Sequence, residues 1–77
     1  MQYKGRWRVV FKAELLKAQM VAKGINAEEL ADKIGINTIT LYRKMNGKTE
    51  FTRSEMQIIK AIFNLNKGEM DAIFFAQ

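Results

Sequence analysis

A pattern of residues that starts α-helices occurs four times in this chain. In each copy a side chain able to cap a helix is followed three residues later by a polar side chain, and an apolar residue stands on either side. The copies cover residues 25–30, 51–56 and 65–70, with a weaker one at 36–41. A capping side chain satisfies a backbone N–H that the helix leaves unpaired, so each copy predicts a helix start. The predicted caps are Asn26, Asn37, Thr52 and Asn66.

Glycines mark where the predicted helices end. The chain contains no proline, so the ends must be set by other residues. Gly24, Gly35 and Gly47 each follow a run with helical apolar spacing, where a left-handed residue commonly closes a helix. The sequence therefore predicts an all-α fold of five short helices. Their expected ranges are 12–23, 27–34, 38–46, 53–63 and 67–75.

Apolar side chains recur with helical spacing on one face of every predicted helix. The predicted core residues are Leu16, Met20, Leu30, Ala31, Ile34, Leu41, Met45, Met56, Ile59, Ile62, Phe63, Met70, Ile73 and Phe74. A chain of 77 residues has room for one such core, which excludes a two-domain enzyme. The last helix adds Phe75 and so offers more apolar surface than a short helix needs. It either covers the end of the bundle or faces a second copy in a dimer.

Two absences from the composition limit the chemistry of this chain. It contains neither cysteine nor histidine, which removes disulfides, thiolate zinc sites, the commonest general base and the commonest metal ligand. Metal-ligand spacing and a glycine-rich phosphate loop are also missing, so we expect no enzyme, metal, cofactor or small-molecule ligand. A hydrophobic content of 48% with a mean hydropathy of -0.21 argues against a disordered tail and a membrane span. A soluble cytoplasmic protein is expected.

The positive charge is unevenly distributed along the chain. The formal net charge is +5 and the isoelectric point about 9.8, which is typical of a protein with a polyanionic partner. Residues 1–23 carry the whole excess, whereas residues 24–47 sum to zero. Within this neutral segment all the acids come early, Arg43 and Lys44 come late, and Lys48 follows. The third predicted helix therefore carries cations and no acid.

Residues 1–11 form a basic segment that precedes the domain predicted at 12–77. Apolar and basic residues alternate here as in a short strand, although a flexible arm fits the same composition. Its cations are Lys4, Arg6 and Arg8. They stand beside Tyr3 and Trp7, a combination suited to phosphates or to the minor groove of DNA. The alternative is a solubilising terminus whose apolar residues pack on the first helix.

Residues 27–46 have the pattern of a helix-turn-helix unit, in which two short helices are joined by a tight turn. The small Ala31 faces inward where the second helix crosses closely. Gly35 supplies the turn, Ile36 is expected to be buried at the bend, and Leu41 anchors the second helix to the core. The remaining side chains of the second helix point mainly outward. They are Thr38, Ile39, Tyr42 and Arg43.

This unit resembles the helix-turn-helix of phage repressor and Cro proteins, the lambda-repressor-like or XRE superfamily. The resembling residues are Gly24-Ile25-Asn26, Glu29-Leu30-Ala31-Asp32-Lys33-Ile34-Gly35-Ile36 and Leu41-Tyr42-Arg43-Lys44-Met45-Asn46-Gly47-Lys48. The resemblance continues through residues 51–55 to 73–75, where it is similar to small regulators from phages and prophages of Gram-positive bacteria. It covers residues 12–75 and implies a compact five-helix DNA-binding domain in a bacterial cell.

The resemblance also implies how the unit would meet DNA. Residues 38–46 would be the recognition helix, with Asn37 and Thr38 entering the major groove first. Thr38 and Ile39 would face base edges, and Arg43 would reach a guanine or a phosphate. Contacts to the DNA backbone are implied for Asn26, Thr40, Tyr42, Asn46 and Lys48.

Two positions depart from the family pattern. Many members pair an arginine in the first helix with a glutamate near the end of the recognition helix, where this chain has Met20 and Met45. An apolar contact is expected in place of that ion pair. Lys44 occupies a position that is often apolar. Either its stem lies on the core while its ammonium reaches the DNA backbone, or the recognition helix is rolled relative to the family.

The expected function is that of a sequence-specific transcriptional regulator, Cro-like or repressor-like, which binds a two-fold operator in double-stranded DNA as a homodimer. One alternative is a protein-interaction module, antirepressor-like or antitoxin-like, that keeps the fold and uses its apolar last helix. Another is a non-specific architectural or RNA-binding protein. Each of these residues also has a purely structural interpretation: Arg43 and Lys44 form a solvated helix face, Asn26 and Asn37 serve only as caps, and Tyr42 only packs.

Overall fold

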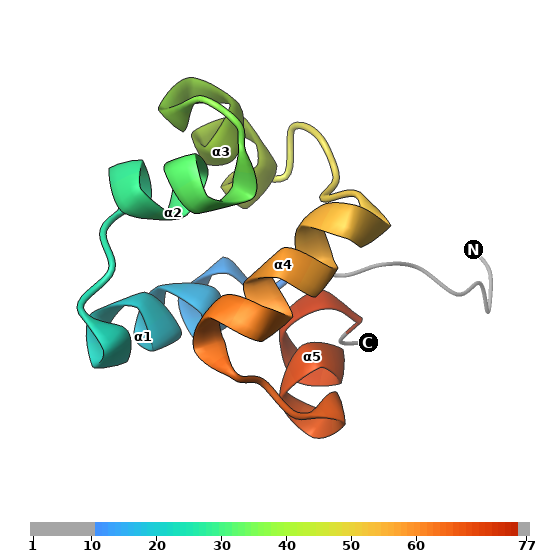
Figure 1. Cartoon of the computed structure of the whole chain (residues 1–77). Coiled ribbons are helices and arrows are strands. Elements are labelled where there is room, and N and C mark those ends of the chain that lie inside the picture. The colour runs from blue at the N-terminus through green and yellow to red at the C-terminus, as the bar shows by residue number, and fades with distance from the viewer. Residues whose placement is uncertain (1–10, 76–77) are drawn as a thin grey trace, which may run out of the picture.

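The computed structural model describes residues 11–75, and the regular structure in that range is helical throughout (Figure 1). Its helices are α1 (Ala13–Lys23), α2 (Ala27–Ile34), α3 (Thr38–Met45), α4 (Arg53–Phe63) and α5 (Lys67–Phe74). The predicted all-α fold of five short helices is confirmed, and each boundary lies within one residue of its expected position. The arm or strand predicted at residues 1–11, with Lys4, Arg6 and Arg8, lies outside the described residues except for Phe11.

Side-chain caps start four of the five helices, at the residues that the sequence pattern indicates. At α2, Oδ1 of Asn26 accepts a hydrogen bond from the Glu29 N–H at 2.8 Å, and the Asn26 N–H donates to the Glu29 carboxylate at 3.0 Å. At α3, Asn37 accepts from the Thr40 N–H at 2.7 Å. The reciprocal pair of bonds seen at α2 also starts α4 and α5, between Thr52 and Glu55 and between Asn66 and Glu69. Each cap is worth about 1 kcal/mol.

The turn between α2 and α3 depends on Gly35. Its φ is +90°, a conformation that side chains of L-amino acids rarely adopt, and its N–H donates to the Ala31 carbonyl at 2.8 Å. A Cβ built on Gly35 would have no atom within 4 Å, so the constraint is backbone conformation rather than space. Positive φ is confirmed at Gly24 and Gly47 too, whereas the left-handed Asn64 that ends α4 was not anticipated.

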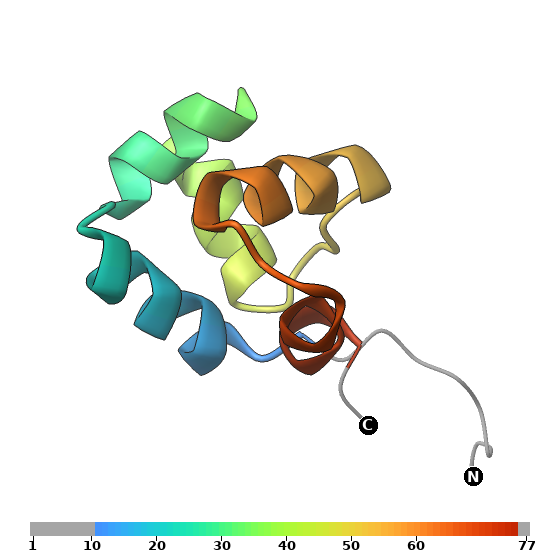
Figure 2. The same ribbon diagram turned by 60° about the horizontal axis from the view of Figure 1, so that its bottom comes forward.

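The helices share one core around α4. α2 lies against α3 and α4, while α1 lies against α4 and α5, as the two views show (Figures 1 and 2). The buried apolar residues are Leu16, Met20, Leu30, Ala31, Ile34, Leu41, Met45, Phe51, Ile59, Phe63, Leu65, Met70, Ile73 and Phe74. Phe51 and Leu65 enter the core from loops, although the sequence marked them only as neighbours of caps. Met56, Ile62 and Ile36, which were expected to be buried, are only partly buried.

The last helix covers the end of the bundle. Met70, Ile73 and Phe74 of α5 are all buried, whereas Phe75 is 42% exposed. Covering the core therefore accounts for most of the apolar surface that made α5 a candidate dimer face. Any partner of this end would meet Phe75 rather than the whole apolar face of the helix.

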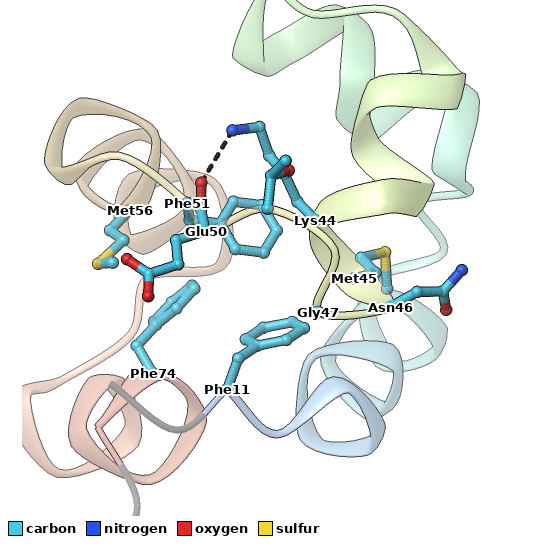
Figure 3. Close-up of a pocket in the computed structure, with 10 residues that line it drawn as sticks. Phe11, Lys44, Met45, Asn46, Gly47, Glu50, Phe51, Met56 and Phe74 are labelled. Atoms are coloured by element: carbon cyan, nitrogen blue, oxygen red, sulfur yellow. Dashed lines mark hydrogen bonds between the residues drawn. The ribbon is translucent and has the colours of Figure 1, made fainter. Parts of the chain in front are cut away.

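Three phenyl rings join the first described residue to α5. The ring centroid of Phe11 lies 5.1 Å from that of Phe51 and 5.6 Å from that of Phe74 (Figure 3). The Lys12 N–H donates to the Ile73 carbonyl at 2.7 Å, which ties the start of α1 to the end of α5. Phe11 thus packs on Phe51 and Phe74, whereas the solubilising-terminus interpretation expected packing on the first helix, and it does not extend as a strand.

We expect the same substitution to lower stability at one glycine and not at another. Gly35→Ala forces an alanine to a φ of +90° and should lower the free energy of unfolding by about 1–2 kcal/mol. Gly68→Ala places a Cβ inside α5, 3.4 Å from Oδ1 of Asn66, and should leave stability unchanged or raise it by up to about 1 kcal/mol. Urea unfolding measures both. Equal effects at the two sites would contradict the role given to Gly35.

Candidate nucleic-acid interface

The outer side of α3 and the loop that follows it form one continuous surface, which we call the α3 surface. It is hollowed into a depression of about 560 Å³, lined by Ile39, Tyr42, Arg43, Asn46, Lys48 and Thr49. Ile39 is 68% exposed and Tyr42 51% exposed. The lining contains two cations and no acid. The structure thus brings together five residues that the sequence analysis singled out, and it adds Thr49, whose only sequence signal is its place beside Lys48.

The packing of α3 explains why these side chains face outward. Leu41 is fully buried and Met45 nearly so, and residues on the opposite side of the helix must then point to solvent. This is the outward orientation that the sequence pattern predicts for Ile39, Tyr42 and Arg43. The Lys48 N–H donates to the Arg43 carbonyl at 2.8 Å. That bond keeps the start of the loop against the end of the helix.

The predicted groove-entering residues lie at the other end of α3. Asn37 is exposed, whereas Thr38 and Thr40 are half-buried. Oδ1 of Asn37 is occupied by the Thr40 N–H, so the amide NH₂ of Asn37 is the part that can donate to another group. None of the three lines the depression of the α3 surface. They adjoin it at the helix start.

Asn26 is separate from the α3 surface. It lines a different hollow, of about 460 Å³, together with Lys17, Val21 and Gly24 of the α1 end. Both its backbone N–H and its Oδ1 are engaged by Glu29. The start of α2 therefore carries a carboxylate where the resemblance implies a phosphate, and the structure does not group Asn26 with Arg43.

Lys44, which was predicted to contact the DNA backbone, turns its ammonium away from the α3 surface. Its side chain is only 10% exposed, and its Nζ lies 3.0 Å from Oε1 of Glu55. The same Nζ donates to the Glu50 carbonyl at 3.0 Å, in the direction opposite to Asn46 (Figure 3). An isolated ammonium is costly to bury, so this one is held by a carboxylate and a carbonyl that α4 and the loop supply. The stem lies on the core as expected, but the charge stays inside the protein.

The sequence did not indicate that Lys44 and Glu55 form an ion pair. Met20 and Met45, which stand where the family that the sequence resembles often has an ion pair, both belong to the buried apolar cluster, as expected. Glu55 was interpreted only as the partner of the Thr52 cap. Its Oε1 in fact accepts the Thr52 N–H at 2.8 Å and pairs with Lys44 as well. No local pattern marks this pairing, because the two residues lie on different helices.

The surroundings of Glu55 lower its pKa. Burial by itself raises the pKa, but the backbone N–H of Thr52 and the ammonium of Lys44 both favour the carboxylate and outweigh burial. The pKa of Glu55 thus lies below its ordinary value of 4.5 in the folded protein. In the unfolded chain these partners are lost, so the proton binds more tightly there.

The lowered pKa of Glu55 predicts that this carboxylate makes the free energy of unfolding depend on pH in the acid range. A lowered folded pKa stabilises the protein above the unfolded pKa of about 4.5, and this contribution is lost as the pH falls through the folded pKa. The gap in unfolding free energy between the parent chain and Glu55→Gln should therefore be constant from pH 7 to about 5 and shrink below about 4.5. Urea unfolding across this range measures the gap. A gap that widens in acid would contradict the direction of the shift.

The part of the chain that the structure describes holds no group of three or more acidic, cysteine or histidine residues placed to bind a metal ion. Within residues 11–75, none of the helices has the length and apolarity needed to cross a membrane.

No protein-family model, curated protein or solved structure matches this chain.

Proposed function

We propose that this chain is a sequence-specific, double-stranded DNA-binding transcriptional regulator of the phage or prophage Cro-like or repressor-like kind. α2, the Gly35 turn and α3 act as its helix-turn-helix, and α3 is the recognition helix. It acts in the bacterial cytoplasm and needs no cofactor, metal or small-molecule ligand. The observation that carries the proposal is the α3 surface, where apolar, hydrogen-bonding and cationic side chains lie together without an acid.

The side chains of the α3 surface suit the edges and phosphates of a DNA groove. Ile39 offers apolar contact to a thymine methyl group, and Arg43 can donate two hydrogen bonds to a guanine. Tyr42, Asn46 and Lys48 can donate to phosphates, which fix the position of a protein without reading sequence. An α-helix with its side chains is about 10–12 Å across, which fits a major groove about 12 Å wide.

The second candidate, a protein-interaction module, depended on surplus apolar surface on the last helix. Burial of Met70, Ile73 and Phe74 removes most of that surplus and leaves Phe75. An adaptor also has no need of the cations Arg43 and Lys48 beside an exposed Ile39. The DNA-binding proposal accounts for all three, so it is the one we put forward.

Selection of duplexes from a random DNA pool tests the proposal directly. A homodimer with two-fold symmetry places its recognition helices about 34 Å apart, so the enriched sequences should contain two inverted half-sites about 10 base pairs apart. Retention of DNA without any motif would favour an architectural protein. Failure to retain DNA would overturn the proposal and favour the interaction module.

Arg43→Ala tests the assigned contact within the selected site. We expect the preference for the selected duplex over a scrambled one to fall by about 10- to 100-fold, because a bidentate base contact is worth about 1–3 kcal/mol. Titrations of both duplexes at one salt concentration measure this ratio.

Lys67→Ala is the matched control, since Lys67 is exposed and, within residues 11–75, pairs with Asp71 of the same helix, α5. That helix lies at the end of the molecule away from α2 and α3 (Figure 1). The Lys67→Ala substitution should leave the ratio of the affinities for the two duplexes unchanged. An unchanged ratio in Arg43→Ala as well would remove Arg43 from the recognition contacts.

A further inference from the structure

Lys44 joins three separate parts of the chain through one nitrogen atom. The residue belongs to α3, its Nζ donates to the Glu50 carbonyl of the following loop, and it pairs with Glu55 in the first turn of α4. Each of the two Nζ···O distances is 3.0 Å. We call this set of contacts the Lys44 tether. The side chains of Lys44 and Glu55 are only 10% and 14% exposed, so water competes little for the contacts.

The loop that the tether holds is the one that completes the α3 surface. Residues 46–52 connect α3 to α4, and Lys48 and Thr49 of this loop line the depression together with Arg43. The beginning of the loop is bonded to α3 through the Lys48 N–H. Its end is fixed by the Thr52 cap and the buried Phe51. Lys44 adds the bond at Glu50, between these two anchored ends.

We infer that Lys44 is a positioning residue for DNA recognition, which sets where the loop side chains Lys48 and Thr49 stand relative to Arg43. The inference rests on the proposed function. A base contact by Arg43 and a phosphate contact by Lys48 must be made by one rigid body, since a small misplacement of one group weakens the other contact. The Lys48 N–H bond to the Arg43 carbonyl holds the start of the loop, and the tether holds the loop at Glu50 without touching DNA itself.

Positioning and direct contact differ in their dependence on salt. A lysine that meets a phosphate releases counterions, so its removal lowers the slope of log affinity against log salt by about one per protomer. A lysine whose charge is already paired with Glu55 releases none. On the scrambled duplex, where binding requires no fixed spacing between Arg43 and Lys48, Lys44→Met should therefore leave the slope unchanged, whereas the matched Lys48→Met should reduce it.

The test compares Lys44→Met, Glu55→Gln and Lys48→Met on a selected and a scrambled duplex, at a temperature where circular dichroism shows each variant folded. Loss of the tether should reduce the preference for the selected duplex about tenfold, as expected for the loss of one coupled interaction. Lys44→Arg keeps the charge and the donors and should restore most of the preference. Glu55→Gln weakens the tether but keeps an acceptor for the Thr52 N–H and therefore preserves the cap. It replaces Lys44→Met in the test if that variant fails to fold.

A second readout needs no DNA. The ¹⁵N relaxation of backbone amides reports motion on the picosecond to nanosecond timescale, and the amides of Lys48 and Thr49 should become more mobile in Lys44→Met and Glu55→Gln but not in Lys48→Met. If the parent chain selects no duplex, the proposed function fails while this readout still decides whether the tether orders the loop. Rigid loop amides in both tether variants would overturn the inference. A reduced salt slope of Lys44→Met on the scrambled duplex would overturn it too, in favour of a direct contact.

Discussion

Helices of 8 to 11 residues, the range found for α1 to α5, are marginal in water because few hydrogen bonds repay the unfavourable first turn. Each one therefore depends on burying one face in a common core. The largest fully buried side chains come from all five helices: Phe63, Phe74, Leu16, Leu30, Leu41 and Ile59. Caps then satisfy the exposed helix starts. The buried face and the capped start of a helix supply its stability. The opposite, exposed face can therefore carry side chains that serve binding.

α3 shows this division most clearly. Leu41 and Met45 face the core, Lys44 faces α4, and Ile39 and Arg43 face solvent. Replacing a buried ion pair by apolar groups is often neutral for stability, so what distinguishes the pair of Lys44 with Glu55 from an apolar contact is the geometry that it fixes. The three directions in which α3 points its side chains thus match three requirements: anchoring the helix, orienting it and presenting a surface.

The helix ends were predictable because the rules behind them are local. A cap acts on an N–H three residues away, so Asn26 and Asn37 could be assigned from sequence alone. The partner of Lys44 could not, because Glu55 lies on another helix and already had a complete local explanation as a capping residue. Spacing showed which residues share a face of α3. Only the packing of α4 against the rest of the fold showed where the charge of Lys44 goes.

Because the charge of Lys44 is buried, attraction to phosphates and discrimination between bases are assigned to different parts of the chain under the proposed function. With Lys44 neutralised by Glu55, the depression on the α3 surface is lined by two cations, Arg43 and Lys48, beside apolar and amide groups. Such a mixture suits the reading of base edges better than general attraction to phosphate, which depends on the number of cations. Residues 1–23 carry the whole net charge of +5. Under the proposed function, the basic N-terminal part therefore supplies sequence-independent attraction, and the α3 surface supplies discrimination.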